Sequence, residues 1–154
     1  MESFLAPVRA LTALIAMTPK SLVQLVLRLA LAVPFWKSGI LKWETFPTKV
    51  NETAVLLFTE EFQLHLPFAT VPYPFPELTA HLVALAEVTL PVLLVVGLLT
   101  RFAGLGILVM SIMIQLTVPE GWPIHLTWAA MALAIMAQGA GWLSLDTALR
   151  IERN

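Results

Sequence analysis

A carboxylic acid lies near the middle of an apolar stretch that is long enough to cross a bilayer. The stretch runs from Glu77 to Arg101, and the acid is Glu87. Helical rise places Glu87 roughly 15 Å below one face of a hydrocarbon core about 30 Å thick. A charge at that depth costs about 2.5 to 3.5 kcal/mol, so Glu87 requires a partner, a wet cavity or a bound proton. Pro91 lacks an amide hydrogen, so it frees the backbone carbonyl of Glu87 and favours a bend in the same turn.

Arg28 is a second ionisable side chain inside an apolar stretch, one that begins near Ser21. Measured from the face where the chain begins, helical rise places Arg28 at a depth of about 10 Å and Glu87 at about 18 Å. An extended arginine side chain nearly closes this gap, so we predict an ion pair between Arg28 and Glu87. Two interpretations of the pair stay open. It fixes the register of two helices, or it marks a proton path or a polar ligand head group.

Four more polar side chains are expected in the opposite half of the membrane, near its outer interface. Glutamine and histidine donate hydrogen bonds that suit the carbonyl of a quinone head group, whose tail would leave between helices. The alternative is that lipid headgroups and water satisfy each side chain separately. The candidate ligand-binding residues are Lys37, His81, Gln115 and His125.

Other kinds of cofactor chemistry find little support in the residues present. The chain has no cysteine, and its histidines, His65, His81 and His125, lack paired ligand spacing. Met110 and Met113 share a helix face, which is typical of packing. The sequence contains no nucleophile motif, P-loop or dinucleotide fingerprint. We therefore predict no metal site and no covalently bound cofactor, and quinone is the candidate cofactor.

The composition is that of a membrane protein. Of the 154 residues, 58% are hydrophobic and 12% are charged, whereas soluble domains average about 25% charged. The formal net charge is -1, so the chain has no basic surface for nucleic acid. The lipid bilayer is the expected partner.

The apolar stretches predict an all-α, integral membrane four-helix bundle with peripheral amphipathic helices. We treat residues 1–154 as a single membrane domain, with spans at about 21–41, 77–99, 102–118 and 124–138 and an outer loop at 44–76. Near the N-terminus, one amphipathic face is formed by Phe4, Val8, Leu11 and Ile15. A second amphipathic helix is expected within the outer loop, resting on the membrane. Ser144 is expected to cap a short helix near the C-terminus.

Four spans place both termini on one side of the membrane, and the basic residues indicate which side. The termini side would carry Arg9, Lys20, Arg101, Arg150 and Arg153. On the opposite side, glutamates dilute Lys37, Lys42 and Lys49, and the first two lysines are expected to extend to the interface. The positive-inside rule therefore predicts that both termini are cytoplasmic.

Three stretches together resemble the DoxX family of four-helix bacterial and archaeal membrane proteins. They are RLALAVPFWKSGILKW, AEVTLPVLLVVGLLTRFAGLGILVM and GAGWLSLD, and the likeness covers roughly Leu22 to Arg150. The positions that match the family pattern are Arg28, Gly39, Lys42, Glu87, Gly97 and Arg101. The resemblance implies a four-helix bundle in the inner membrane of a bacterium or archaeon. It also implies a link to membrane redox assemblies, since relatives include a subunit of a thiosulfate:quinone oxidoreductase and a component that recruits soluble oxidative-stress enzymes.

We therefore expect a DoxX-like inner-membrane protein that is an accessory or quinone-proximal subunit of a membrane redox system. Whether the chain catalyses a reaction stays open. Because it has no cysteine for sulfur transfer, we expect a non-catalytic subunit of an oxidoreductase complex rather than an enzyme on its own. Two alternatives stay open. One is a non-enzymatic carrier or binder of an apolar metabolite or lipid, and the other is a membrane anchor for soluble partners. The partners left open are soluble or membrane redox proteins and further copies of the same chain.

Overall fold

The computed structural model describes residues 2–151, with side chains from residue 5 onward. The expected contribution of Phe4 to an amphipathic face and the positive charge of Arg153 lie outside the described part of the chain. Most of the described chain is helical, and the helices occupy the apolar stretches of the sequence.

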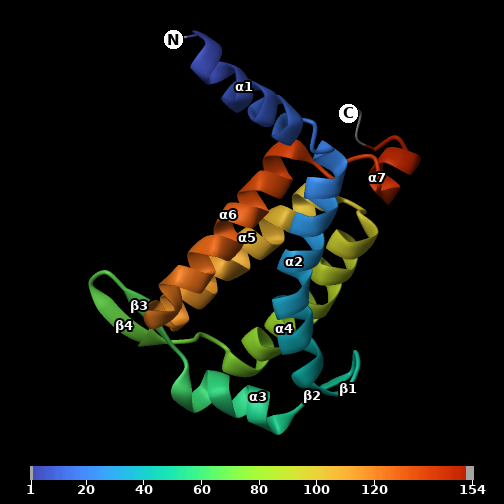
Figure 1. Ribbon diagram of the computed structural model, residues 1–154. Coiled ribbons are helices and arrows are strands. Elements are labelled where there is room, and N and C mark those ends of the chain that lie inside the picture. Colours follow the sequence, from blue (N-terminus) through green and yellow to red (C-terminus); the bar gives the residue numbers. More distant parts are fainter. Residues whose placement is uncertain (1, 152–154) are drawn as a thin grey trace.

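Four long helices pack side by side and form the body of the protein (Figure 1). They are α2 (Lys20–Leu41), α4 (Pro76–Val96), α5 (Thr100–Thr117) and α6 (Trp122–Gln138). α2 packs on α4 and on α6, and α5 packs on α4 and on α6. Their ends differ by no more than three residues from the expected ranges. Within residues 2–151, three helices, α2, α4 and α5, are long and apolar enough to cross a membrane, while α6 has 17 residues.

The four helices are apolar on both their inward and their outward faces. The largest buried cluster is made of Leu31, Ala32, Phe35, Leu94, Ala103, Ile107, Ala132 and Ile135. Outward-facing residues such as Val33, Val92, Val109 and Leu133 are equally apolar, although about half of each side chain is exposed. Helices that are hydrophobic all round are typical of a membrane environment.

Gly39 sets the register between α2 and α4. A β-carbon at this position would lie 2.8 Å from the backbone carbonyl carbon and oxygen of Glu87. Only glycine therefore allows the two helices to approach this closely. Pro91 removes the amide that would bond the Glu87 carbonyl within the helix, and this carbonyl faces Gly39. Both α2 and α4 continue as helix through their prolines, Pro34 and Pro91.

Residues 43–75 form a lid over one end of the four helices, which we call the lid end. The lid consists of β1 (Trp43–Thr45), β2 (Lys49–Val50), α3 (Glu52–Leu56), a short π-helical turn η1 (Leu57–Glu61), β3 (Gln63–Leu66) and β4 (Ala69–Pro72). β1 pairs antiparallel with β2, and β3 with β4. The all-α prediction is wrong here. These strands have two to four residues, too few to show the alternating pattern by which strands are identified in a sequence.

The helical part of the lid packs on α4. Ala54 of α3 forms a buried cluster with Ala84, and Phe58 of η1 forms another with Ala80. Alanines on α4 thus leave room for the lid to approach. The helix expected in the outer loop is present, and its buried side chains pack on α4.

The opposite end of the helices, which we call the terminal end, carries α1 (Glu2–Ala16) and α7 (Leu145–Ala148) (Figure 1). α1 extends away from the other helices, and its side chains from Leu5 onward are exposed. Ser144 caps α7 by accepting a hydrogen bond from the Thr147 amide at 3.3 Å, which confirms the sequence prediction. A short turn, η2 (Pro119–Gly121), joins α5 to α6 at the lid end.

Candidate functional site

A buried ion pair joins the lid end of α2 to the middle of α4. Lys42 Nζ lies 2.5 Å from Glu87 Oε2, with 16% and 5% of the two side chains exposed. Ser38, one turn before Lys42, accepts a hydrogen bond from Lys42 Nζ at 2.7 Å and donates one to Glu87 Oε1 at 3.2 Å. The carboxylate is thus held at both oxygens, and two of the three ammonium hydrogens are used.

The predicted ion pair between Arg28 and Glu87 is wrong. The register set by Gly39 places Glu87 beside the lid end of α2, whereas Arg28 precedes Gly39 by 11 residues. This separation corresponds to about 16 Å of helical rise, more than an arginine side chain spans. Lys42 was expected to extend to the interface, but it turns inward to Glu87 instead.

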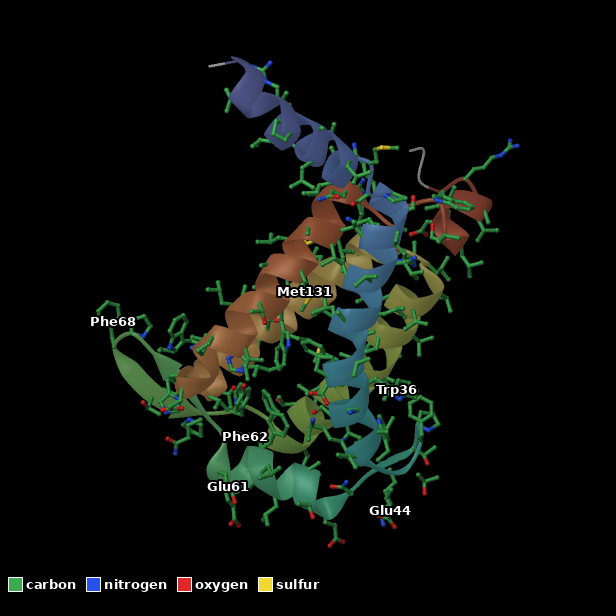
Figure 2. The ribbon with its side chains drawn as sticks, viewed as in Figure 1. Trp36, Glu44, Glu61, Phe62, Phe68 and Met131 are labelled. Carbon is green, nitrogen blue, oxygen red and sulfur yellow. The ribbon has the colours of Figure 1, made fainter. Side chains whose placement is uncertain are left out.

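A cavity of about 210 Å³ lies beside the Lys42–Glu87 pair, between α4, α5 and the lid. Apart from the ion pair, apolar and aromatic side chains dominate its lining. Phe58 contacts both Phe62 and Tyr73 in edge-on arrangements, each with ring centroids 5.2 Å apart. Figure 2 shows Phe62 on the lid, lying toward the helices, in contrast to Phe68 at the tip of the β3–β4 hairpin. The Tyr73 hydroxyl lies 2.5 Å from Thr117 Oγ1, so the lid is tied to α5.

On one side, the cavity extends to the outward-facing surface of α5. Val109, Met113 and Val118 line it, and each of these side chains is 38% to 52% exposed. The volume is below the range of about 300 to 1,000 Å³ that is usual for small-molecule sites. A single ring or a small head group therefore fits, whereas a long apolar tail must leave along α5. Edge-on aromatic contacts suit a ring inside such a cavity.

Arg28 belongs to a second buried polar cluster at the terminal end. It is fully buried, and its guanidinium donates to the carbonyls of Leu94 at 3.2 Å and Leu143 at 2.6 Å. Leu94 lies in the last turn of α4, where backbone carbonyls carry partial negative charge. Asp146 is close enough to interact electrostatically with Arg28. The arginine thus joins α2 to the end of α4 and to the C-terminal segment.

Asp146 completes this cluster by capping α5. Its carboxylate accepts hydrogen bonds from the amides of Leu99 at 2.7 Å and Thr100 at 2.8 Å, and the start of a helix favours a negative charge. Its own amide donates to the carbonyl of Gly97 at 2.8 Å. Gly97 has a φ of 69°, and a side chain there would collide with the Arg28 guanidinium. We call Arg28, Gly97 and Asp146 the terminal clasp.

The four predicted ligand-binding residues do not lie in one pocket. Gln115 and His125 are in contact, with Gln115 Oε1 and His125 Nδ1 2.9 Å apart. His81 is exposed in a separate hollow, where its Nδ1 lies 2.8 Å from the Glu77 carbonyl oxygen. Lys37 borders a different groove, of about 380 Å³, between α2 and α4. Of the four, only Gln115 and His125 share a site.

Sequence reasoning identified Arg28 and Glu87 as buried polar residues but missed the partners that each of them has in the structure. Ser38 and Lys42 are four residues apart, so they share a helix face, and the intervening Gly39 was a signal for close packing on that face. The lid aromatics and Asp146 lie in short irregular segments, where the sequence contains no periodic pattern to place them. Within residues 2–151, no three His, Asp or Glu side chains group in a way that would hold a metal ion.

Comparison with known proteins gives a family match and one distant relative. The family profile named DoxX matches residues 23–120. An uncharacterized protein of Haemophilus influenzae is 27% identical over 135 residues, which cover 82% of each chain. No solved structure matches the chain. Together with the three apolar helices, the family match indicates a membrane protein.

Proposed function

The chain belongs to the DoxX family, and from this premise we propose that it is a quinone-proximal accessory subunit of a membrane redox system. In this proposal the quinone head group occupies the cavity beside Lys42 and Glu87. The isoprenoid or alkyl tail leaves along α5 into the lipid. Electrons come from a partner protein, and the chain itself positions the quinone.

The observation that carries this proposal is the unused donor capacity of Lys42 at the cavity wall. An ammonium group has three hydrogens to donate. Glu87 and Ser38 accept two of them, and within residues 2–151 the third has no hydrogen-bond partner. A quinone carbonyl is an acceptor without hydrogens, so it fits this position. Phe58, Phe62 and Tyr73 supply aromatic contacts for the ring.

The groove between α2 and α4 favours a second candidate function, the binding of a lipid or another apolar metabolite. Its lining consists of apolar side chains and a single charged one, Lys37. An acyl chain would lie along Val92 and Val96, with an anionic head group near Lys37. A further alternative is an anchor for soluble proteins, for which the exposed α1 and the lid offer surfaces.

The proposal includes an orientation in the inner membrane. We infer that all four long helices cross the bilayer, with the shorter α6 accommodated by local thinning. The terminal end, where Arg9, Lys20, Arg101 and Arg150 lie, faces the cytoplasm, and the lid faces the other side. In this orientation, the Lys42 cavity binds quinone from the outer half of the membrane.

Titration with a short-tailed quinone tests the proposal on protein in nanodiscs. The variant is Lys42→Met combined with Glu87→Leu, which removes the donor without leaving an unpaired charge. We expect the Kd for the oxidised quinone, followed by quenching of tryptophan fluorescence, to rise roughly ten- to a hundredfold, because a hydrogen bond from a charged donor is lost.

Lys37→Met is the matched control for this titration. Lys37 lies on the same helix and near the same interface, but it borders the other groove. Its substitution should leave the Kd unchanged. If Lys37→Met weakens binding while the double variant does not, the quinone occupies the α2–α4 groove and the proposal for the Lys42 cavity fails.

A further inference from the structure

A groove between α5 and α6 differs from the Lys42 cavity in the hydrogen-bonding groups that it offers. Its volume is about 290 Å³, and most of its lining is apolar. The polar side chains in the lining are Ser111, Gln115 and His125. His125 is 8% exposed, and its ring lies beside that of Trp128 with centroids 5.3 Å apart.

A chain of hydrogen bonds fixes which nitrogen of His125 carries the proton. Gln115 Nε2 donates to the carbonyl of Pro119 at 3.0 Å, so the amide oxygen of Gln115 faces the histidine. That oxygen only accepts, and it lies 2.9 Å from His125 Nδ1. Nδ1 therefore carries the hydrogen, and in the neutral ring Nε2 is an acceptor.

The groove thus offers acceptors where the Lys42 cavity offers a donor. His125 Nε2 has no hydrogen-bond partner within residues 2–151. Ser111 already donates its hydroxyl hydrogen to the Ile107 carbonyl at 2.8 Å, so its oxygen also has only acceptor capacity left. A ligand for this groove must bring its own hydrogen on an otherwise apolar body.

We propose that the α5–α6 groove binds a quinol, with a quinol hydroxyl donating to Nε2 of His125. The reduced ring carries hydroxyl hydrogens, whereas the oxidised ring carries only carbonyl acceptors. The two redox forms therefore match different sites, the quinone beside Lys42 and the quinol beside His125. This inference depends on the proposed function only in taking a quinone-type molecule as the ligand.

Space for the imidazole comes from Gly121 in η2. A β-carbon at Gly121 would collide with the edge of the ring that carries Cε1 and Nε2. Trp122, the next residue, is 60% exposed and forms part of the groove wall. Gly121 thus leaves room for the imidazole, and His125 and Trp122 line the same groove, in which a quinol ring would lie.

A matched pair of ligands tests the hydrogen bond directly. The probes are a short-tailed 1,4-hydroquinone and its dimethyl ether, titrated under a reducing atmosphere into nanodiscs. The protein carries Lys42→Met with Glu87→Leu, so that the first cavity does not contribute. We expect the ether to bind roughly tenfold more weakly than the hydroquinone, and His125→Phe to remove this difference by weakening only the hydroquinone.

Equal affinities of the two probes, or a preference for the hydroquinone that survives His125→Phe, would overturn the inference. Failure of the proposed function appears separately, as oxidised quinone binding that is insensitive to Lys42→Met with Glu87→Leu. Should His125→Phe not fold, ¹⁵N spectra of a protein with His65→Asn and His81→Asn report the tautomer of His125. The inference is supported if Nδ1 carries the hydrogen and the ¹⁵N chemical shift of Nε2 changes when the hydroquinone is added. It is contradicted if Nε2 carries the hydrogen.

Discussion

Glu87→Leu is expected to lower the free energy of unfolding by about 3 to 5 kcal/mol, because it leaves the Lys42 ammonium buried without its counterion. The double variant Lys42→Met with Glu87→Leu removes both charges, and replacement of a buried pair by apolar side chains is commonly neutral or stabilising. It should therefore recover most of the loss. Unfolding in mixed micelles, followed by tryptophan fluorescence, measures all three proteins.

The exposed pair between Glu44 and Lys49 supplies the control. Its atoms are 2.7 Å apart, similar to the buried pair, but 51% and 58% of the side chains are exposed. An exposed pair is worth at most about 1 kcal/mol, so Glu44→Leu should change stability by less than that. A loss as small for Glu87→Leu as for Glu44→Leu would mean that water reaches Lys42, and the pair would not be buried as described.

Arg28→Met is expected to cost a similar amount, about 3 to 5 kcal/mol, through a different mechanism. The change leaves the carbonyls of Leu94 and Leu143 without their donor and Asp146 without its nearby positive charge. The C-terminal segment should then detach from the four helices. Thermal unfolding measures the stability, and the rate at which carboxypeptidase digests the chain measures the detachment.

Arg9→Met is the control for this prediction, since Arg9 lies on the exposed α1. It removes the same charge at the same end of the protein, and it should change neither the melting temperature nor the digestion rate. If Arg28→Met lowers stability without speeding digestion, Arg28 supports the helix packing but does not hold the C-terminal segment.

Sequence reasoning placed the helices well because long apolar stretches bounded by proline, glycine and charge identify them. It failed on the partner of Glu87 because helical rise gives depth along one helix but says nothing of the register between two. A glycine decides that register, because α2 lies against the backbone of α4 at Gly39, which brings Lys42 to Glu87. The lid strands are held by antiparallel pairing with each other and by contact with α4 and α5. Neither can be read from a short stretch of sequence.

The positions that carry the family resemblance separate into two groups in the structure. Gly39, Lys42 and Glu87 meet where the lid end of α2 lies against the middle of α4. Arg28 and Gly97 meet at the terminal end, where Arg101 also donates to the Ala137 carbonyl at 3.1 Å and so joins α5 to the end of α6. All six positions thus belong to two clusters of contacts, one at the lid end of α2 and one at the terminal end. Lys42 and Glu87 of the first group line a cavity, and the second group holds the C-terminal segment and the end of α6 against the other helices.

Photolabelling with a quinone that carries a diazirine on its ring tests the central claim most directly. The label is activated on wild-type protein in nanodiscs, and the adducts are mapped by mass spectrometry with and without excess unlabelled quinone. Binding beside Lys42 and Glu87 predicts adducts on Phe58 or Phe62 of the lid and on Met110 or Met113 of α5, all suppressed by competition. Competable adducts confined to Val92 and Val96, with none on the lid, would contradict it.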